Sequence, residues 1–287
     1  MSAPAIDLNG AVVAITGGAR GIGLATAREF TARGARVAIG DLDGDATEAV
    51  AAQIGPDAIG PPLDVTDRWS FEAFVANVEQ ELGPIDVLVN NAGIMPAGPF
   101  LDEADATSDA QIDVNLRGPI HGMKIVLPGM IERGRGHVVN VASMAGKAYV
   151  PGLAVYNSTK FAVVGLCEAV LDELDGTGVT ITAILPTAVK TELISGLPAK
   201  GLAAVEPEQV AKAIVDSVGH RRPEVAVPRW FNAYPVLKAL TPRAVERAIR
   251  RWIGGRRLMK PTAIDHQARG GYDERIGESS SRVEAKR

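Results

Sequence analysis

Short apolar runs alternate with amphipathic stretches along the first 228 residues of the chain. Each run is too short for a helix, and most are rich in β-branched residues, which favours buried β-strands. The stretches between the runs place apolar residues three and four positions apart, as in helices that pack one face on a core. Seven strands are predicted in this way, at residues 11–15, 36–40, 59–63, 85–89, 137–142, 179–185 and 224–228.

Strands that alternate with helices form parallel βαβ units with right-handed crossovers. The pattern therefore predicts an α/β fold of the Rossmann type, a doubly wound parallel sheet of about seven strands with helices on both faces. In such sheets, ligands bind at the carboxyl ends of the strands. We expect residues 1–228 to form this one domain, with the functional residues at or beside those ends.

The pattern changes after residue 228. Thr241 and Pro242 are typical of a helix start, and a basic amphipathic helix is predicted at 242–253. We expect residues 229–269 to form a basic helical extension. Residues 270–287 are charged and serine-rich, which predicts a disordered tail.

Charge is unevenly distributed over the 287 residues. The net charge is −4, but residues 229–287 carry 14 Lys and Arg against 6 Asp and Glu, and the rest of the chain is correspondingly acidic. The predicted basic helix could lie on an anionic membrane surface, or pack on the acidic body or a second subunit; we favour packing. Nucleic-acid binding is not expected, because the body is acidic and no stacking aromatics interleave the arginines.

Composition and cysteine content indicate the class of protein. Hydrophobic residues make up 46% and charged residues 22%, as in a globular protein with a sizeable core. There is no uninterrupted apolar run of about 18 residues and no signal-peptide pattern at the N-terminus. The single cysteine, Cys167, cannot form an internal disulfide, which suits a reducing compartment. We therefore expect a cytoplasmic protein, and no metal site is predicted.

A glycine-rich loop with the sequence T-G-G-A-R-G-I-G occupies residues 16–23, between the first strand and a helix at 24–33. Glycines let the backbone turn tightly and approach a pyrophosphate, whose charge the helix N-terminus stabilises. This context predicts a dinucleotide site. Its contacts from the loop are expected to be Thr16, Gly17, Arg20, Gly21, Ile22 and Gly23.

Asp41 ends the second strand, about 20 residues past the glycines, where a carboxylate accepts hydrogen bonds from the adenosine ribose. A carboxylate there repels a 2′-phosphate and so favours NAD over NADP. Arg20 is the counter-argument, because an arginine in the loop could pair with that phosphate. We weigh Asp41 more heavily, and NADP remains the alternative.

Tyr156 and Lys160 lie four residues apart, one turn from each other on a predicted helix. A free tyrosine has a pKa of about 10, too high for a base near neutral pH. A nearby cation favours the phenolate, so Lys160 is expected to lower the pKa of Tyr156. Ser143, at the end of the fifth strand, could donate a hydrogen bond to the same substrate oxygen. Together they suggest an acid–base site.

Several motifs in register resemble the short-chain dehydrogenase/reductase family, in its single-domain branch. The glycine loop matches that family's T-G-x-x-x-G-x-G motif, and residues 90–93 match its N-N-A-G motif. Its catalytic tetrad is matched in order and spacing by Asn115, Ser143, Tyr156 and Lys160. The resemblance covers about residues 8–228. It implies hydride transfer between NAD(P) and a secondary alcohol or ketone, in a homodimer or homotetramer.

The resemblance also implies roles for single residues. Asn115 would hold a water of the proton relay through its carbonyl, at a kink in a helix, and Lys160 would bond the nicotinamide ribose. Thr187 departs from the family pattern, which has glycine there. The other cofactor contacts implied are Asp64 and Val65 at the adenine, Asn91, Ala92 and Gly93 behind the cofactor, and Pro186, Val189 and Thr191 at the nicotinamide.

The segment from 192 to 205 is similar in position to the family's substrate loop and is largely apolar. An apolar alcohol or ketone is the expected substrate, although the same residues could instead pack on a lid or a neighbouring subunit. A non-catalytic protein that senses dinucleotides is a further alternative. The residues expected to line the substrate cleft are Met95, Met144, Tyr149, Leu153 and Leu193.

Overall fold

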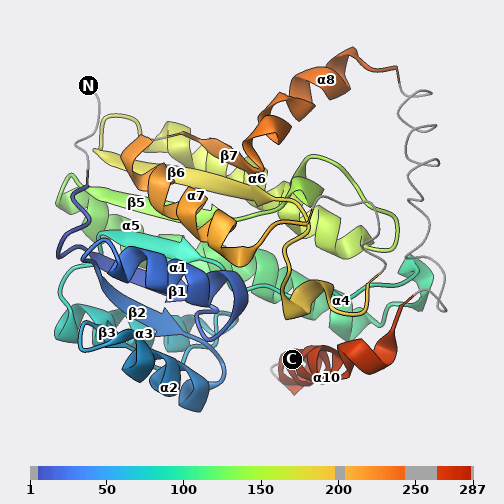
Figure 1. Cartoon of the computed structure of the whole chain (residues 1–287), viewed down its shortest axis with the longest axis horizontal. Helices are drawn as coiled ribbons and strands as arrows, with labels where there is room; N and C mark the ends of the chain where they lie inside the picture. Colours follow the sequence, from blue (N-terminus) through green and yellow to red (C-terminus); the bar gives the residue numbers. More distant parts are fainter. Residues whose placement is uncertain (1–5, 198–203, 221, 243–263, 286–287) are drawn as a thin grey trace.

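The computed structural model describes residues 6–197, 204–220, 222–242 and 264–285. Its centre is one sheet of seven parallel strands in the order β3-β2-β1-β4-β5-β6-β7 (Figure 1). The predicted Rossmann-type fold is confirmed. The strands are β1 Val12–Thr16, β2 Arg36–Gly40, β3 Ala58–Ile59, β4 Val87–Asn90, β5 Gly136–Val141, β6 Val179–Pro186 and β7 Glu224–Val227.

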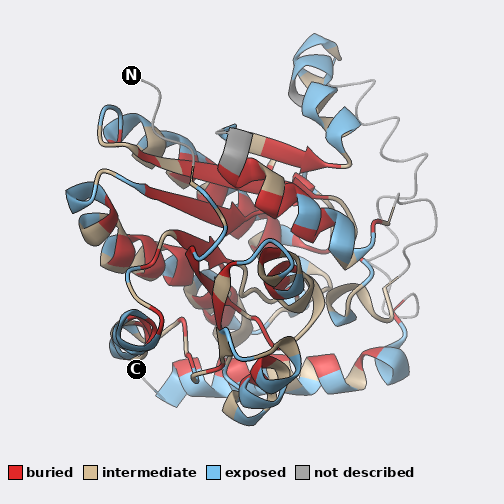
Figure 2. Ribbon diagram, turned by 60° about the vertical axis from the view of Figure 1, so that its left-hand side comes forward, coloured by how far each residue is buried: buried red, intermediate tan, exposed pale blue. Residues whose placement is uncertain are grey.

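Three helices cover each face of the sheet, and each layer has its own apolar core. Phe30 and Ile214 belong to one core, and Phe71 and Phe74 belong to the other. Figure 2 shows the buried strands between these layers. One layer contains α1 Gly21–Thr31, α2 Gly44–Ile54 and α7 Pro207–His220, and the other contains α3 Arg68–Glu81, α5 Gly118–Glu132 and α6 Ala154–Glu173.

The third strand is shorter than predicted. We expected 59–63, but β3 ends at Ile59, and beyond it only an isolated bridge joins Asp41 to Pro62. Pro61 and Pro62 have no N–H group to donate to a ladder, so regular pairing stops before them.

Short elements gather beyond the carboxyl ends of the strands. The segment after β4 contains the 3₁₀ turn η1 Phe100–Asp102, α4 Asp105–Ile112 and a π-helical turn, η2 Asp113–Arg117, which runs into α5. Two more 3₁₀ turns follow strands there, η3 Met144–Gly146 after β5 and η4 Glu192–Ile194 after β6. These elements surround the edge where the sequence predicts the site.

The C-terminal tail differs from the prediction. Residues 270–287 were expected to be disordered, but α10 His266–Ala285 is a helix over most of that range. Its charged composition hides an apolar stripe that includes Tyr272, Ile276 and Val283, all buried, and α10 packs along α4. Tertiary packing of this narrow stripe outweighs the polar composition.

The rest of the extension is only partly described. After β7 the chain forms the 3₁₀ turn η5 Arg229–Ala233 and then α8 Tyr234–Leu240. The amphipathic helix predicted at 242–253 lies, apart from its first residue, outside the described residues. Among the helices that the structure describes, none has the length and hydropathy to cross a membrane.

Candidate active site

The glycine loop turns between β1 and α1, and close backbone contacts require its glycines. A Cβ on Gly17, where φ is 66°, would lie 2.9 Å from the Cα of Ala92, and a Cβ on Gly23 would lie 2.2 Å from the carbonyl oxygen of Gly17. Asn91 donates from Nδ2 to the carbonyl oxygens of Thr16 (2.9 Å) and Gly17 (3.0 Å). These contacts hold the loop in a fixed shape against the end of β4.

The N-terminus of α1 fits an anionic group. Its N-cap residue, Arg20, makes no side-chain cap, so the first-turn N–H groups around Gly21, Ile22 and Gly23 keep their donors for a ligand. The positive end of the helix dipole adds to the attraction. The glycine cradle and these donors together suit a dinucleotide pyrophosphate.

The two residues expected to decide between NAD and NADP lie at the end of β2 and in the loop. The Asp41 carboxylate makes no hydrogen bond or ion pair with any residue that the structure describes. Arg20 is engaged by two carboxylates, with Nη2 3.4 Å from Asp43 Oδ2 and Nη1 3.9 Å from Glu192 Oε2. The acidic residue is thus available, while the arginine is drawn away from a 2′-phosphate.

Asp64 and Val65, the residues expected at the adenine, follow the short third strand. Thr66 donates to Oδ1 of Asp64 from its backbone N (2.9 Å) and from its hydroxyl (2.6 Å), which fixes the carboxylate. Val65 is buried against Gly118, where a Cβ would lie 3.1 Å from the valine side chain.

The acid–base residues meet on the inner face of α6. Lys160 donates from Nζ to the carbonyl oxygen of Val141 (2.9 Å), and Nζ lies 5.6 Å from the centre of the Tyr156 ring. Ser143, the N-cap of η3, accepts from the backbone N of Ala145 (3.0 Å) and hydrogen-bonds Tyr156. Tyr156 and Lys160 are 6% and 5% exposed, so both work out of contact with bulk water.

Burial dominates the acid–base balance of this pair. It raises the pKa of Tyr156 to about 12, although the hydrogen bond with Ser143 acts in the opposite direction. It also lowers the pKa of Lys160 to about 8, since the ammonium is the charged form. The expected lowering of the Tyr156 pKa is therefore wrong for this structure, because desolvation sets the direction of the shift.

Asn115 lies inside the π-helical turn η2, as the expected kink requires. Its amide is paired with the backbone of Ile94, accepting from N and donating to O at 2.8 Å each, and Nδ2 lies 3.3 Å from the Thr159 hydroxyl. The side chain therefore ties η2 to the N-N-A-G loop and to α6. Wide turns of this kind often mark functional sites.

The segment after β6 contains the residues expected at the nicotinamide. Pro186 O lies 3.5 Å from the Ser143 hydroxyl, and Val189 forms an isolated bridge with Val205. Thr191 approaches the start of α1, where a Cβ on Gly21 would be 3.2 Å from its methyl group. Thr187 donates from its backbone N (2.9 Å) to Val227 O, with its hydroxyl 3.3 Å from the same oxygen, so this departure from glycine is accommodated by β7.

Three of the five predicted substrate-lining residues share a cluster with Tyr156. Met95, Leu153 and Leu193 pack around the tyrosine. Met144 instead lies in the core beneath β6 and borders a hollow with Lys147. The apolar wall beside the reacting tyrosine is therefore smaller than expected.

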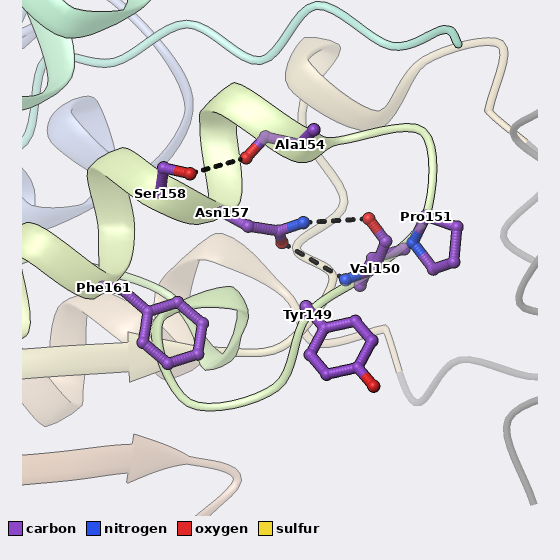
Figure 3. Close-up of a pocket in the computed structure, with 7 residues that line it drawn as sticks. All are labelled: Tyr149, Val150, Pro151, Ala154, Asn157, Ser158 and Phe161. Atoms are coloured by element: carbon purple, nitrogen blue, oxygen red, sulfur yellow. Dashed lines mark hydrogen bonds between the residues drawn. The ribbon is translucent and has the colours of Figure 1, made fainter. Parts of the chain in front are cut away.

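Tyr149 lies away from this cluster. Figure 3 shows it beside Phe161 in a separate pocket, where Asn157 donates to the backbone oxygen of Val150 at 2.9 Å. This pocket is on a different face of α6 from the one that carries Tyr156, because the helix turns Phe161 away from the catalytic pair. The structure thus separates Tyr149 from the cluster around Tyr156, and its place in the substrate cleft stays a prediction.

Comparisons with known proteins agree with this geometry. A family model described as short chain dehydrogenase matches residues 11–200. The chain belongs to the short-chain dehydrogenase family. The family membership that the motifs predicted is thereby confirmed.

Two relatives and one solved structure illustrate the breadth of the family. The 17-beta-hydroxysteroid dehydrogenase 13 of Rattus norvegicus is 32% identical over 84% of this chain and 83% of its own length. The sorbitol dehydrogenase of Cereibacter sphaeroides is 39% identical over 67% of this chain and 76% of its own length. The structure of a short chain dehydrogenase/reductase from Burkholderia phymatum in complex with NAD has a TM-score of 0.75 and 24% identity, covering 81% of this chain and 94% of that one, and supports the fold.

Other curated relatives are much longer. The chain spans 18% of the glycine betaine reductase ATRR of Emericella nidulans and 44% of the probable oxidoreductase EphD of Mycobacterium tuberculosis.

This short-chain dehydrogenase has two site residues that sequence reasoning missed, both on α10. Arg269 donates from Nη2 to the carbonyl oxygen of Met95 (2.6 Å), and Met95 N donates to the Tyr272 hydroxyl (2.7 Å). Tyr272 lies in the tail expected to be disordered, and Arg269 is the last residue of the predicted extension before it. The available signal was the helical spacing of Arg269, Tyr272 and Ile276.

In the described part of the chain, no group of three or more His, Cys, Asp or Glu residues could hold a metal ion.

Proposed function

We propose that this short-chain dehydrogenase transfers hydride between NAD(H) and a secondary alcohol or ketone with an apolar body. The observation that carries the proposal is that Ser143 hydrogen-bonds the buried Tyr156, which lies beside the buried Lys160. Such a constellation positions a proton donor or acceptor next to a dinucleotide site. A purely structural role would not require these polar groups in the interior.

Each residue has a distinct task in this proposal. When bound, NAD⁺ accepts the hydride from the carbinol carbon. Tyr156 takes the hydroxyl proton in oxidation and returns a proton in reduction, while Ser143 orients and polarises the same oxygen. Lys160 would bond the nicotinamide ribose, and Asn115 would hold the relay water. The charge of Lys160 also favours the phenolate as it forms.

The first experiment is titration of the purified protein with NADH and with NADPH, followed by cofactor fluorescence or calorimetry. Tight NADH and weak NADPH would agree with the unpaired carboxylate of Asp41 and the engaged state of Arg20. The reverse result would support the alternative, an NADP-dependent ketone reductase. An Asp41→Ser variant should bring the two affinities together by weakening NADH and admitting NADPH, because it removes both the ribose acceptor and the repulsion of a 2′-phosphate.

Tyr156→Phe separates binding from chemistry. We expect turnover to fall by roughly 10³-fold, as for the loss of an acid–base group. NADH affinity should stay within about twofold, because a hydroxyl that acts only on the substrate oxygen contributes little to cofactor binding. Turnover is measured by NADH absorbance, and a variant that keeps most of its activity would contradict the role of Tyr156.

The substrate class follows from the wall beside Tyr156. Met95, Leu153 and Leu193 offer no charge there, which supports an apolar alcohol or ketone such as an alicyclic one. One relative is named for a hydroxysteroid and another for sorbitol, so the family accommodates both extremes of polarity. A panel of alicyclic alcohols and polyols with NAD⁺ would test the apolar preference.

A non-catalytic sensor of dinucleotides is the alternative from another class. All four tetrad residues are present, and Asn115, Tyr156 and Lys160 are buried, which such a protein would not need. Tight NADH binding without turnover of any alcohol or ketone in the panel would move this alternative ahead.

We further propose a cytoplasmic homodimer or homotetramer. The buried single cysteine, Cys167, is compatible with a reducing compartment, and Phe161 and Ile131 leave apolar surface on α6 and α5 for a second copy. Light scattering after gel filtration measures the mass, and a monomer at micromolar concentration would contradict the proposal.

A peripheral membrane contact is a second candidate for the extension. It is favoured by α8, where Val236, Leu237 and Leu240 are each at least 65% exposed, next to the basic stretch that contains 242–253. Liposomes with and without anionic lipid, spun with the full chain and with a chain that ends at 228, would test this contact.

A further inference from the structure

The C-terminal helix α10 reaches the substrate side of the active site. Loops form that side, and neither the sheet nor its six flanking helices cover it. Arg269 is 2% exposed, and its guanidinium donates to three backbone carbonyl oxygens, of Met95 (2.6 Å), Leu193 (3.0 Å) and Ser195 (3.1 Å). Asp273 balances its charge at 3.0 Å. The guanidinium thereby joins the loop after β4, the loop after β6 and α10 at one point.

Tyr272 is the residue that Arg269 positions. The Arg269 guanidinium carbon lies 4.5 Å from the centre of the Tyr272 ring, and the Tyr272 hydroxyl accepts a hydrogen bond from Met95 N at 2.7 Å. Met95 itself packs against Tyr156. Burial raises the pKa of Tyr272 above its ordinary value, and the neighbouring Tyr156 adds to the rise. The two phenols are therefore close enough to interact electrostatically.

The Tyr272 hydroxyl has one hydrogen-bonding capacity left over. A phenol can both donate and accept. This one accepts from Met95 N, and it donates to no residue that the structure describes. A buried donor without an acceptor is costly, and such groups usually await a ligand or a water.

We propose that Tyr272 is a specificity-determining residue that donates a hydrogen bond to a second oxygen of the substrate, beside the reacting carbon. The inference rests on the proposed function and deepens it. Ser143 and Tyr156 serve the reacting oxygen, and the Met95, Leu153 and Leu193 side chains receive the apolar body. The substrate class is then an apolar compound with two adjacent oxygens, a vicinal diol or its hydroxyketone.

The physical basis of the selectivity is the unpaired donor. A compound with only one oxygen would leave the Tyr272 O–H buried and unsatisfied, while a vicinal diol would satisfy it. Sites built to hydrogen-bond a polar group reject analogues that lack it. Because this contact is the same before and during hydride transfer, it should act on substrate affinity and leave the rate of the bound complex nearly unchanged.

The test uses dead-end complexes of the full-length enzyme with NADH and an alcohol, which cannot react because both partners are reduced. Cyclohexanol and trans-1,2-cyclohexanediol are titrated into the NADH complex, and the change in NADH fluorescence gives each dissociation constant. We expect the wild-type protein to bind the diol about tenfold more tightly, as for one satisfied hydrogen bond. Tyr272→Phe should bring the ratio near one, while Tyr234→Phe on α8 keeps it.

Each other outcome overturns the inference. If Tyr272→Phe weakens both alcohols equally, Tyr272 merely holds Met95 in place. If the wild-type protein shows no preference for the diol, or binds neither alcohol, the donor does not read a second oxygen. Failure to bind NADH at the first step would defeat the proposed function, and this inference with it. Normal NADH binding without the diol preference defeats this inference alone.

Discussion

At the scale of single residues, the site buries a group whose charged form is destabilised by burial. Lys160 is 5% exposed and bonds one carbonyl oxygen, that of Val141. Desolvation lowers its pKa, which means that the folded state disfavours the ammonium form. The fold therefore tolerates a destabilising residue at the position where the proposed chemistry needs a hydrogen-bond donor to the nicotinamide ribose.

Lys160→Met should stabilise the protein and abolish turnover. Removing the buried ammonium should add about 1–2 kcal/mol to the free energy of unfolding at pH 7, after the lost bond to Val141 O is allowed for. The folded pKa of about 8 lies below the value of 10.5 for a free lysine, so the stability lost to Lys160 is present at and below pH 8 and disappears as the pH rises toward 10.5. The gain should accordingly shrink across that window.

Thermal melts at pH 7 and pH 10 measure this difference. Lys124→Met, an exposed lysine on α5, is the matched control and should show a much smaller change with pH. A gain that is equal at both pH values would contradict the assignment of the effect to the buried charge.

At the scale of elements, the turn from β1 into α1 depends on its glycines. Gly23→Ala should reduce NADH affinity by tenfold or more and cost roughly 1–3 kcal/mol of stability, because its Cβ would lie 2.2 Å from Gly17 O and force the loop to move. Gly165→Ala is the matched control. Gly165 is exposed on α6 with nothing within 4 Å of its Cβ, so alanine should stabilise by about 1 kcal/mol through helix propensity.

The contrast between the two variants is measured by melting temperature and by NADH titration. Equal effects on NADH affinity would mean that the loop tolerates a side chain at Gly23 and that the tight turn is not what holds the pyrophosphate.

The elements also show which parts of the fold the sequence could predict. Strands such as β5 are buried on both faces, so their apolar runs identify them directly, and the motifs at their ends locate Ser143 and Asn91. β3 was predicted too long because Pro61 and Pro62 stop a ladder without interrupting an apolar run. α10 was missed because its charged composition outweighs a stripe of one buried residue per turn. The pKa of Tyr156 was missed because its burial comes from residues far away in the sequence, such as Met95.

At the scale of the whole molecule, α10 closes the active site from outside the Rossmann layers. In Figure 1 it lies under α4, at the end of the chain farthest in sequence from the glycine loop. Arg275 adds an ion pair with Glu192, which in turn lies near Arg20. These ion pairs connect the cofactor loop, the substrate loop and the tail. We expect all three together to keep water away from Tyr156.

Arg269→Ala should therefore change the pKa of Tyr156 without altering Tyr156 itself. Loss of three carbonyl contacts should detach α10 and admit water, so the pKa of Tyr156 should fall from about 12 toward the value of about 10 for an exposed tyrosine. Ketone reduction needs the protonated tyrosine, so its rate falls as the pH rises through that pKa. The wild-type enzyme should keep reducing ketones beyond pH 10, whereas the variant should lose activity about two pH units earlier.

The pH profile of kcat/KM for ketone reduction reports this shift, with Arg275→Ala as the control. Arg275 is on the same helix, where it pairs with the exposed Glu192 and lies 5.9 Å from the centre of the Tyr272 ring. Its removal leaves the three carbonyl contacts of Arg269 in place, so α10 should stay docked and the alkaline limb unchanged. The global fold should survive in both variants, because neither core layer of the sheet includes α10. Coincident alkaline limbs in all three proteins would show that the sheet and its helices bury Tyr156 unaided.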